Sequence, residues 1–207
     1  MVYVALDWET SGLLPGTHAH VSLGVAVMED GEVLHEREWL IAPPMKNGNV
    51  TREYAVNALE KSRYTWPQIK RDGLAIRQVM QEFTEWLAHK TDVPPETPVV
   101  AFNAPFDLAW YSEALFLAGE WNNSRKCFEL FRPPITGPWH CARLMAMGAG
   151  LGLDKYDLDT VAGHFGFART SERHGASEDA VLAGKVYAKL VGLALPETRV
   201  HSAKESA

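Results

Sequence analysis

Apolar residues are grouped into short runs at the start of the chain. The N-terminal residues up to Leu6 are almost all apolar, which is typical of a buried strand. Residues 21–28 and 32–41 predict two further strands. Asp30-Gly31 between them is a favoured sequence for a tight hairpin turn. We therefore expect these two strands to be antiparallel neighbours.

Further along, the apolar residues recur at helical spacing. The clearest amphipathic helix follows Asp72-Gly73 and contains Ile76, Val79, Met80, Phe83, Trp86 and Leu87. Residues 99–102 predict a short buried strand, and Pro105 suits the first turn of a helix that follows it, to about residue 118. More helices are expected over residues 141–147, 158–165 and 177–193.

Other stretches give less regular patterns. A short helix is expected over residues 51–62, and a strand over residues 128–131. The segment from residue 63 to Arg71 is less regular, and Pro67 interrupts it. The order of elements, strands first and then helices alternating with single strands, predicts an α/β fold. Its central mixed sheet would be flanked by helices, with the hairpin as its antiparallel edge. We expect residues 1–195 to form one domain and residues 196–207 a polar C-terminal tail.

Composition and charge narrow the functional classes. The chain is 46% hydrophobic and 22% charged, and no apolar run approaches the roughly 20 residues that span a bilayer, so we expect a cytoplasmic protein with no membrane partner. Cys127 and Cys141 lack metal or redox spacing and are expected to be free thiols. A net charge of -6 argues against broad coating of nucleic acid, although an enzyme that contacts a few phosphates stays compatible with it.

Two acids end the first strand. Asp7 and Glu9 are one residue apart, so they share one face of the strand while Leu6 and Trp8 take the other. Two like charges this close need compensation, and a divalent metal held by oxygen ligands would supply it. The alternative is that both acids simply end a strand that enters a turn.

Two later stretches carry further acids. Asp107 falls in the first turn of the helix after residues 99–102, where the helix dipole alone would favour an acid. Ser177 is expected to cap the last helix. Asp179 then heads an apolar stripe, formed by Leu182, Ala183, Val186 and Leu190, and so needs a partner. Glu178 is expected to be solvated, and His174 lies just before the helix.

Together, these stretches resemble the three motifs of the DnaQ-like (DEDDh) 3′-5′ exonuclease family. Asp7-Trp8-Glu9-Thr10 with Ser11-Gly12-Leu13 is similar to the first motif, residues 103–107 to the second, and His174-x-Ala176-x-x-Asp179 to the third. The resemblance spans nearly the whole chain. It implies a ribonuclease H-like fold.

The resemblance also implies an activity and a set of roles. The chain would be a 3′-5′ exonuclease that releases nucleoside 5′-monophosphates from single-stranded DNA with two Mg²⁺ or Mn²⁺ ions. Asp7 would bridge the ions, Glu9 and Asp179 would serve the ion that activates water, and Asp107 the leaving-group side. His174 would be the general base. The terminal nucleotide would be held by Thr10, Gly12 and Leu13, with Asn103 and Phe106 as weaker candidates.

Alternatives stay open within and beyond this chemistry. An RNA or short-oligonucleotide 3′-5′ exoribonuclease is the main rival, and a non-catalytic nucleic-acid-binding module of the same fold is another. The partner would be the 3′ end of a single strand, DNA in preference to RNA, with a replication or repair assembly as a further partner class. Arg169, Arg173 and Lys185 lie near the third motif and are candidates for phosphate contacts, although charges on solvated faces usually have no specific role.

Overall fold

The computed structural model describes residues 1–55 and 60–194. Its centre is a five-stranded sheet in the order β3-β2-β1-β6-β9. The strands are β1 (Val2–Thr10), β2 (His20–Glu29), β3 (Glu32–Leu40), β6 (Val99–Ala101) and β9 (Trp139–Cys141). β2 is antiparallel to β1 and β3, whereas β6 and β9 are parallel to the strands beside them, β1 and β6. This mixed sheet confirms the α/β fold predicted from the sequence.

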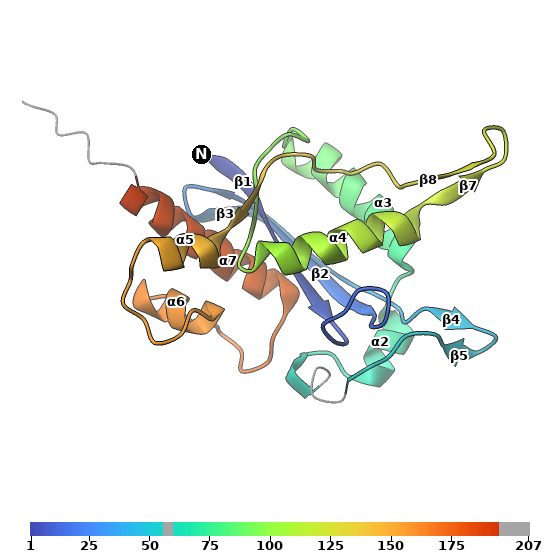
Figure 1. Cartoon of the computed structure of the whole chain (residues 1–207), viewed down its shortest axis with the longest axis horizontal. Helices are drawn as coiled ribbons and strands as arrows, with labels where there is room; N and C mark the ends of the chain where they lie inside the picture. Colours follow the sequence, from blue (N-terminus) through green and yellow to red (C-terminus); the bar gives the residue numbers. More distant parts are fainter. Residues whose placement is uncertain (56–59, 195–207) are drawn as a thin grey trace, which may run out of the picture.

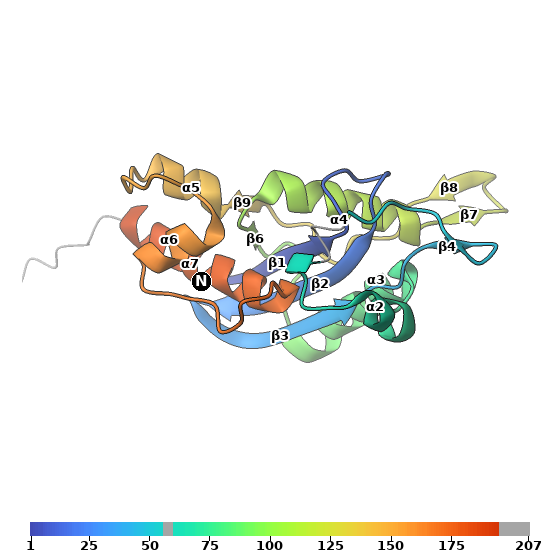
Figure 2. The ribbon, with the colours of Figure 1, turned by 90° about the horizontal axis from the view of Figure 1, so that it is seen from below.

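Helices cover both faces of the sheet (Figures 1 and 2). They are α2 (Trp66–Asp72), α3 (Ile76–Trp86), the π-helical turn η1 (Leu87–Thr91), α4 (Ala104–Ala118), α5 (Ala142–Gly148), α6 (Leu158–His164) and α7 (Ala176–Ala194). Two small hairpins, β4 (Met45–Lys46) with β5 (Asn49–Val50) and β7 (Glu120–Asn122) with β8 (Cys127–Glu129), project from one end of the molecule (Figure 1).

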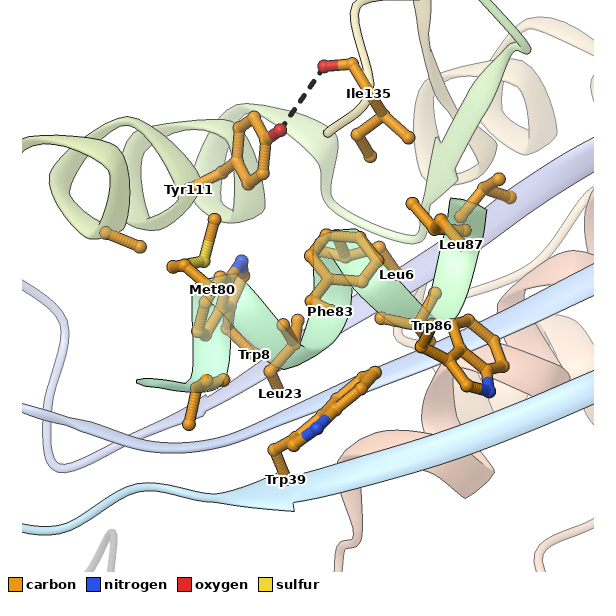
Figure 3. Close-up of a cluster of buried hydrophobic side chains, with 14 of the residues drawn as sticks. Leu6, Trp8, Leu23, Trp39, Met80, Phe83, Trp86, Leu87, Tyr111 and Ile135 are labelled. Atoms are coloured by element: carbon orange, nitrogen blue, oxygen red, sulfur yellow. Dashed lines mark hydrogen bonds between the residues drawn. The ribbon is translucent and has the colours of Figure 1, made fainter. Parts of the chain in front are cut away.

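Two hydrophobic cores, one on each face, hold the sheet between the helices. On one face, α3 and α4 pack against the sheet, and Phe83 lies with Trp39 and Trp86 in an aromatic cluster (Figure 3). The Tyr111 hydroxyl donates to the Ile135 carbonyl at the border of this core, at 3.2 Å. The other core is formed with α5, α6 and α7. β2 is buried on both faces along nearly its whole length, which explains its almost continuous apolar sequence.

The hairpin prediction is confirmed in detail. Asp30 and Gly31 both have positive φ, 51° and 93°, as the tight turn between two twisted antiparallel strands requires. β3 is the edge strand, and its first six residues are exposed and mostly polar, which discourages pairing with another chain. The helices predicted around residues 76–87, 103–118, 141–147, 158–165 and 177–193 are present, with ends shifted by a few residues.

Three local predictions differ in part from the structure. Of the helix predicted over residues 51–62, residues 51–55 are not helical, residues 56–59 lie outside the described part, and residues 60–61 are helical. Pro67 does not interrupt a helix but lies in the first turn of α2, where its missing N–H is not needed, and Thr65 and Gln68 form a capping box there. The strand expected at residues 128–131 is present as β8, which begins one residue earlier and ends two residues earlier, where its pairing with β7 places it.

The remaining predictions concern the two cysteines, the C-terminal tail and membrane-spanning helices. Both Cys127 and Cys141 are free thiols, as predicted. The predicted tail, residues 196–207, lies outside the described residues. Among residues 1–55 and 60–194, no helix is both long and apolar enough to cross a bilayer.

Candidate active site

The end of β1 directs Asp7 and Glu9 to the face of the sheet that α7 covers. Leu6 and Trp8 point to the opposite face, where both are buried in the core shared with α3 and α4, as the alternation of strand side chains predicts. Asp7 is paired in register with Gly24 of β2. A Cβ atom at Gly24 would lie 2.0 Å from the Ala176 carbonyl carbon. The missing side chain therefore lets the first turn of α7 rest directly on the sheet beside Asp7.

Asp107 comes to the same place from α4. It lies in the first turn of this helix, one turn ahead of Trp110 and Tyr111, on the buried face of α4. Only 2% of the residue is exposed. Its Oδ1 accepts a hydrogen bond of 3.2 Å from the backbone N–H of Trp8. This bond ties the second acidic motif to the first, between Asp7 and Glu9.

Asp179 lies in the first turn of α7 and is also buried. The apolar stripe that it heads is buried too, as predicted, with Leu182, Ala183, Val186 and Leu190 all in the core. The helix begins at Ala176, so the prediction that Ser177 caps it was wrong. The backbone N–H of Ser177 instead donates to Glu38 Oε2 of β3, at 3.2 Å, so a side chain from the sheet satisfies this helix end.

His174 is held against Asp179 by backbone hydrogen bonds. Its N–H donates to the Lys61 carbonyl and its carbonyl accepts from the Arg63 N–H, each at 3.0 Å. The half-exposed ring places Nδ1 3.4 Å from Asp179 Oδ2. One ligand atom each from Glu9, His174 and Asp179 lie within 4.8 Å of one another. The structure thus brings the predicted catalytic residues of all three motifs together.

Burial, and after it the charges of neighbouring acids, disfavours the ionised forms of these acids. Burial, with the charges of Asp107 and Glu9, raises the pKa of Asp7 well above its ordinary value. Burial, with the charge of Glu38, raises the pKa of Glu9 to about 7. Burial and Glu9 raise the pKa of Asp107 to about 7, against the lowering effect of the Trp8 N–H. Ionising the whole set at neutral pH requires positive charge among them.

The chemistry of the donor set fits divalent metal ions. Four carboxylates converge from three elements, and hard cations such as Mg²⁺ and Mn²⁺ prefer oxygen ligands. Asp7, Glu9, Asp107 and Asp179 are the residues that could hold them. Bound cations would also lower the high pKa values of Asp7, Glu9 and Asp107, since each ion stabilises the charged form.

A cleft of about 600 Å³ opens beside Glu9 and His174. It is lined by Glu9, Thr10, Gly12, Leu13, Leu14, His18, Ala55, Lys61 and His174. Three of the predicted nucleotide-binding residues are therefore at the cleft, and Leu13 is 77% exposed there. Asn103 lies in a different depression, beside Phe102 and Arg143, and Phe106 packs against the core near Trp110.

Several charged residues near the acids make contacts that the sequence analysis did not predict. Arg169, expected to contact phosphates or solvent, is instead 90% buried and ion-paired with Asp159 and Asp179. Glu38 lies in register with Gly24 and pairs with Arg63. Glu178 was expected to be solvated, but its Oε1 accepts from both the N–H and the hydroxyl of Thr170.

Two curated proteins give a sequence match to the chain, whereas no protein-family model matches it. The PolC-type DNA polymerase III of Thermotoga petrophila is 25% identical over 193 residues, which are 91% of this chain but 12% of the polymerase. The 3′-5′ DNA exonuclease Cap18 of Escherichia coli is 26% identical over 106 residues, 51% of this chain and 52% of the relative. The chain thus spans 12% and 52% of the lengths of these two relatives.

Solved structures share the fold of this chain over most of its length. The nuclease domain of 3′hExo, a DEDDh family member bound to rAMP, has a TM-score of 0.68 at 13% identity, with 92% of each chain covered. Pop2p of S. pombe, in a form with Mg²⁺ and Mn²⁺ bound, has a TM-score of 0.64 at 16% identity, covering 91% of this chain and 82% of that one. The predicted resemblance to the DEDDh exonucleases is confirmed in the fold.

Proposed function

We propose that this chain, which has the ribonuclease H-like fold of the DEDDh exonucleases, is a metal-dependent 3′-to-5′ exonuclease. One observation carries the proposal: Asp7, Glu9, Asp107, His174 and Asp179 converge from β1, α4 and the start of α7 beside one open cleft. A non-catalytic binding module would have no need to bury several mutually repelling carboxylates.

The four carboxylates are proposed to hold two Mg²⁺ or Mn²⁺ ions. Such ions supply Lewis-acid stabilisation of the attacking and leaving oxygens of a phosphodiester. The chain contributes the fixed positions of the donors: the Asp107–Trp8 hydrogen bond sets the second motif against the first, and the contact at Gly24 sets Asp179 against Asp7. Asp7 would serve both ions, Glu9 and Asp179 would hold the ion that activates water, and Asp107 would hold the ion on the leaving-group side.

His174 is the proposed general base. Its Nδ1 lies 3.4 Å from Asp179 Oδ2, on the side of the acids, and Nε2, the other ring nitrogen, is proposed to accept the proton. Burial, and after it the charge of Arg169, lowers the pKa of His174, so the ring is neutral at neutral pH and able to act as a base. The backbone bonds to Lys61 and Arg63 hold the ring in place.

The proposed substrate is the 3′ end of single-stranded DNA, with nucleoside 5′-monophosphates as products. The exposed Leu13 and Leu14 give the cleft an apolar wall on which an unpaired base can pack. The similarity to a DNA exonuclease and a DNA polymerase favours DNA, and a replication or repair assembly is the partner class that this similarity suggests. RNA is the second candidate, because the similar 3′hExo domain is bound to rAMP.

The test uses DNA and RNA strands of one sequence, labelled at the 5′ end, with Mg²⁺, Mn²⁺ or a chelator. We expect a ladder of products shortened from the 3′ end, dependent on metal, faster on DNA, and absent in the Asp7→Ala variant. Faster degradation of RNA would replace DNA by RNA as the proposed substrate and leave the proposed mechanism unchanged. Degradation that persists in chelator, or that starts at the 5′ end, would contradict the mechanism.

A further inference from the structure

Arg169 connects the first turns of two consecutive helices. It lies on the loop between α6 and α7, and its side chain is only 10% exposed. Its Nε donates to Asp159 Oδ1 of α6 at 2.5 Å, and its Nη1 is ion-paired with Asp179 Oδ1 of α7. The two partners differ sharply in environment, since the side chain of Asp159 is 60% exposed and that of Asp179 is 6% exposed.

The guanidinium group also acts on the other acids of the site. Its charge lowers the pKa values of Asp7 and Glu9, against the larger raising effect of burial. Arg169 is therefore a cation that already lies among the carboxylates proposed to bind metal. A carboxylate oxygen paired with a guanidinium is a poor ligand for a second cation, because the two positive charges repel at contact distance.

We propose that Arg169 is an internal counter-ion that divalent metal must displace from Asp179, so that it sets the metal concentration at which the site fills. This inference rests on the proposed function, because it assumes that Asp179 is a metal ligand. On displacement, Arg169 keeps its bond to the exposed Asp159 and moves toward solvent. In the absence of metal it compensates the buried charge of Asp179 and stabilises the fold.

The loop has a second attachment that does not involve Arg169. The N–H and the hydroxyl of Thr170 both donate to Glu178 Oε1 of α7. The Arg169→Gln variant should therefore keep the path of the loop while losing the charge. Arg173 offers a matched control, because it lies on the same loop and is exposed, so that Arg173→Gln removes the same charge from solvent.

The experiment measures Mn²⁺ binding by titration calorimetry and the melting temperature in chelator, with the full chain. Removing the competing ion pair should tighten Mn²⁺ binding by Arg169→Gln roughly tenfold. The same variant should melt at a lower temperature in chelator, because Asp179 is left buried and unpaired. Arg173→Gln should change Mn²⁺ affinity less than about twofold. Asp159→Asn should weaken Mn²⁺ binding, because the displaced Arg169 loses its other partner.

The opposite signs for Arg169→Gln separate displacement from a simple structural role, in which stability and metal affinity would fall together. Weaker or unchanged Mn²⁺ binding by Arg169→Gln would overturn the inference and leave the proposed function intact. Wild-type protein that binds no Mn²⁺ would contradict the proposed function itself. If Arg169→Gln does not fold, Arg169→Met removes the charge while keeping the apolar stem of the side chain packed. It should then bind Mn²⁺ more tightly than wild type, and weaker binding would overturn the inference.

Discussion

Asp107→Asn should stabilise the metal-free protein even though it should abolish activity. The carboxylate of Asp107 is buried beside Glu9, with one hydrogen bond from the Trp8 N–H. Asparagine has nearly the same shape and keeps an oxygen that can accept this bond, but it carries no charge. The substitution therefore removes the cost of a buried charge, and with it the smaller repulsion from Glu9, without leaving a cavity.

The size of the effect follows from the pKa of Asp107. Burial, with the charge of Glu9, raises this pKa from 3.8 to about 7. Since one pKa unit corresponds to about 1.36 kcal/mol, ionised Asp107 at pH 8 costs the folded state about 4 kcal/mol. The folded pKa lies above the unfolded value, so this loss of stability develops as the pH rises from about 4 to about 7. At pH 5 the difference is only about 1.5 kcal/mol.

Urea denaturation of both proteins in chelator, at pH 5 and pH 8, measures this effect. We expect Asp107→Asn to raise the free energy of unfolding by about 2 to 4 kcal/mol at pH 8, and by about 1 kcal/mol at pH 5. Asp157→Asn is the matched control. The N–H and hydroxyl of Thr160 hold the pKa of Asp157 below its ordinary value, so neutralising this acid should give no gain at pH 8.

Two results would refute the reasoning. One is an Asp107→Asn variant that is less stable than wild type at both pH values, which would mean that the charge is already compensated within the metal-free protein. The other is a gain of equal size at pH 5 and pH 8, which would show that the effect does not come from ionisation of the carboxylate.

Three further substitutions test the fold and the cleft. Gly24→Ala places a Cβ atom 2.0 Å from the Ala176 carbonyl carbon and should lower activity by about 100-fold by displacing Asp179, whereas Gly163→Ala, with no neighbouring atom within 4 Å, should not. Phe83→Ala should lower the free energy of unfolding by about 3 to 5 kcal/mol in urea titrations, because this ring is fully buried against Trp39. Leu13→Ala should raise KM for single-stranded DNA in steady-state kinetics with little change in kcat, and a selective fall in kcat would contradict a binding role.

The acidic motifs were predictable because their signals are local. Asp7 and Glu9 share a face through the alternation of a strand, Asp107 and Asp179 each occupy the first turn of a helix, and Asp179 heads a regular apolar stripe. The hairpin turn at Asp30-Gly31 was equally local, since two residues with positive φ suffice to define it. These elements are encoded within a few residues, whereas the meeting of the four acids in one site was predicted only through the resemblance of the three motifs to the DEDDh exonucleases.

The charged residues around the acids were not predictable in the same way. Glu38 and Glu36 lie on the same exposed edge strand, and their sequence pattern does not distinguish them. Glu38 is partly buried because the register of the sheet places it opposite Gly24, whereas Glu36 is exposed. Arg169 lies in an irregular loop, where its burial depends on how α6 and α7 approach each other. β9 was missed because three residues are too few to give a periodic pattern.

Mass-spectrometric identification of the products formed from an unlabelled single-stranded DNA of known sequence tests the central proposal most directly. With Mg²⁺, the wild-type chain should release nucleoside 5′-monophosphates in the order of the sequence read from the 3′ end, and Asp7→Asn should release none. Nucleoside 3′-monophosphates, internal fragments, or an equal yield from Asp7→Asn would contradict a metal-dependent 3′-to-5′ exonuclease site built on these acids.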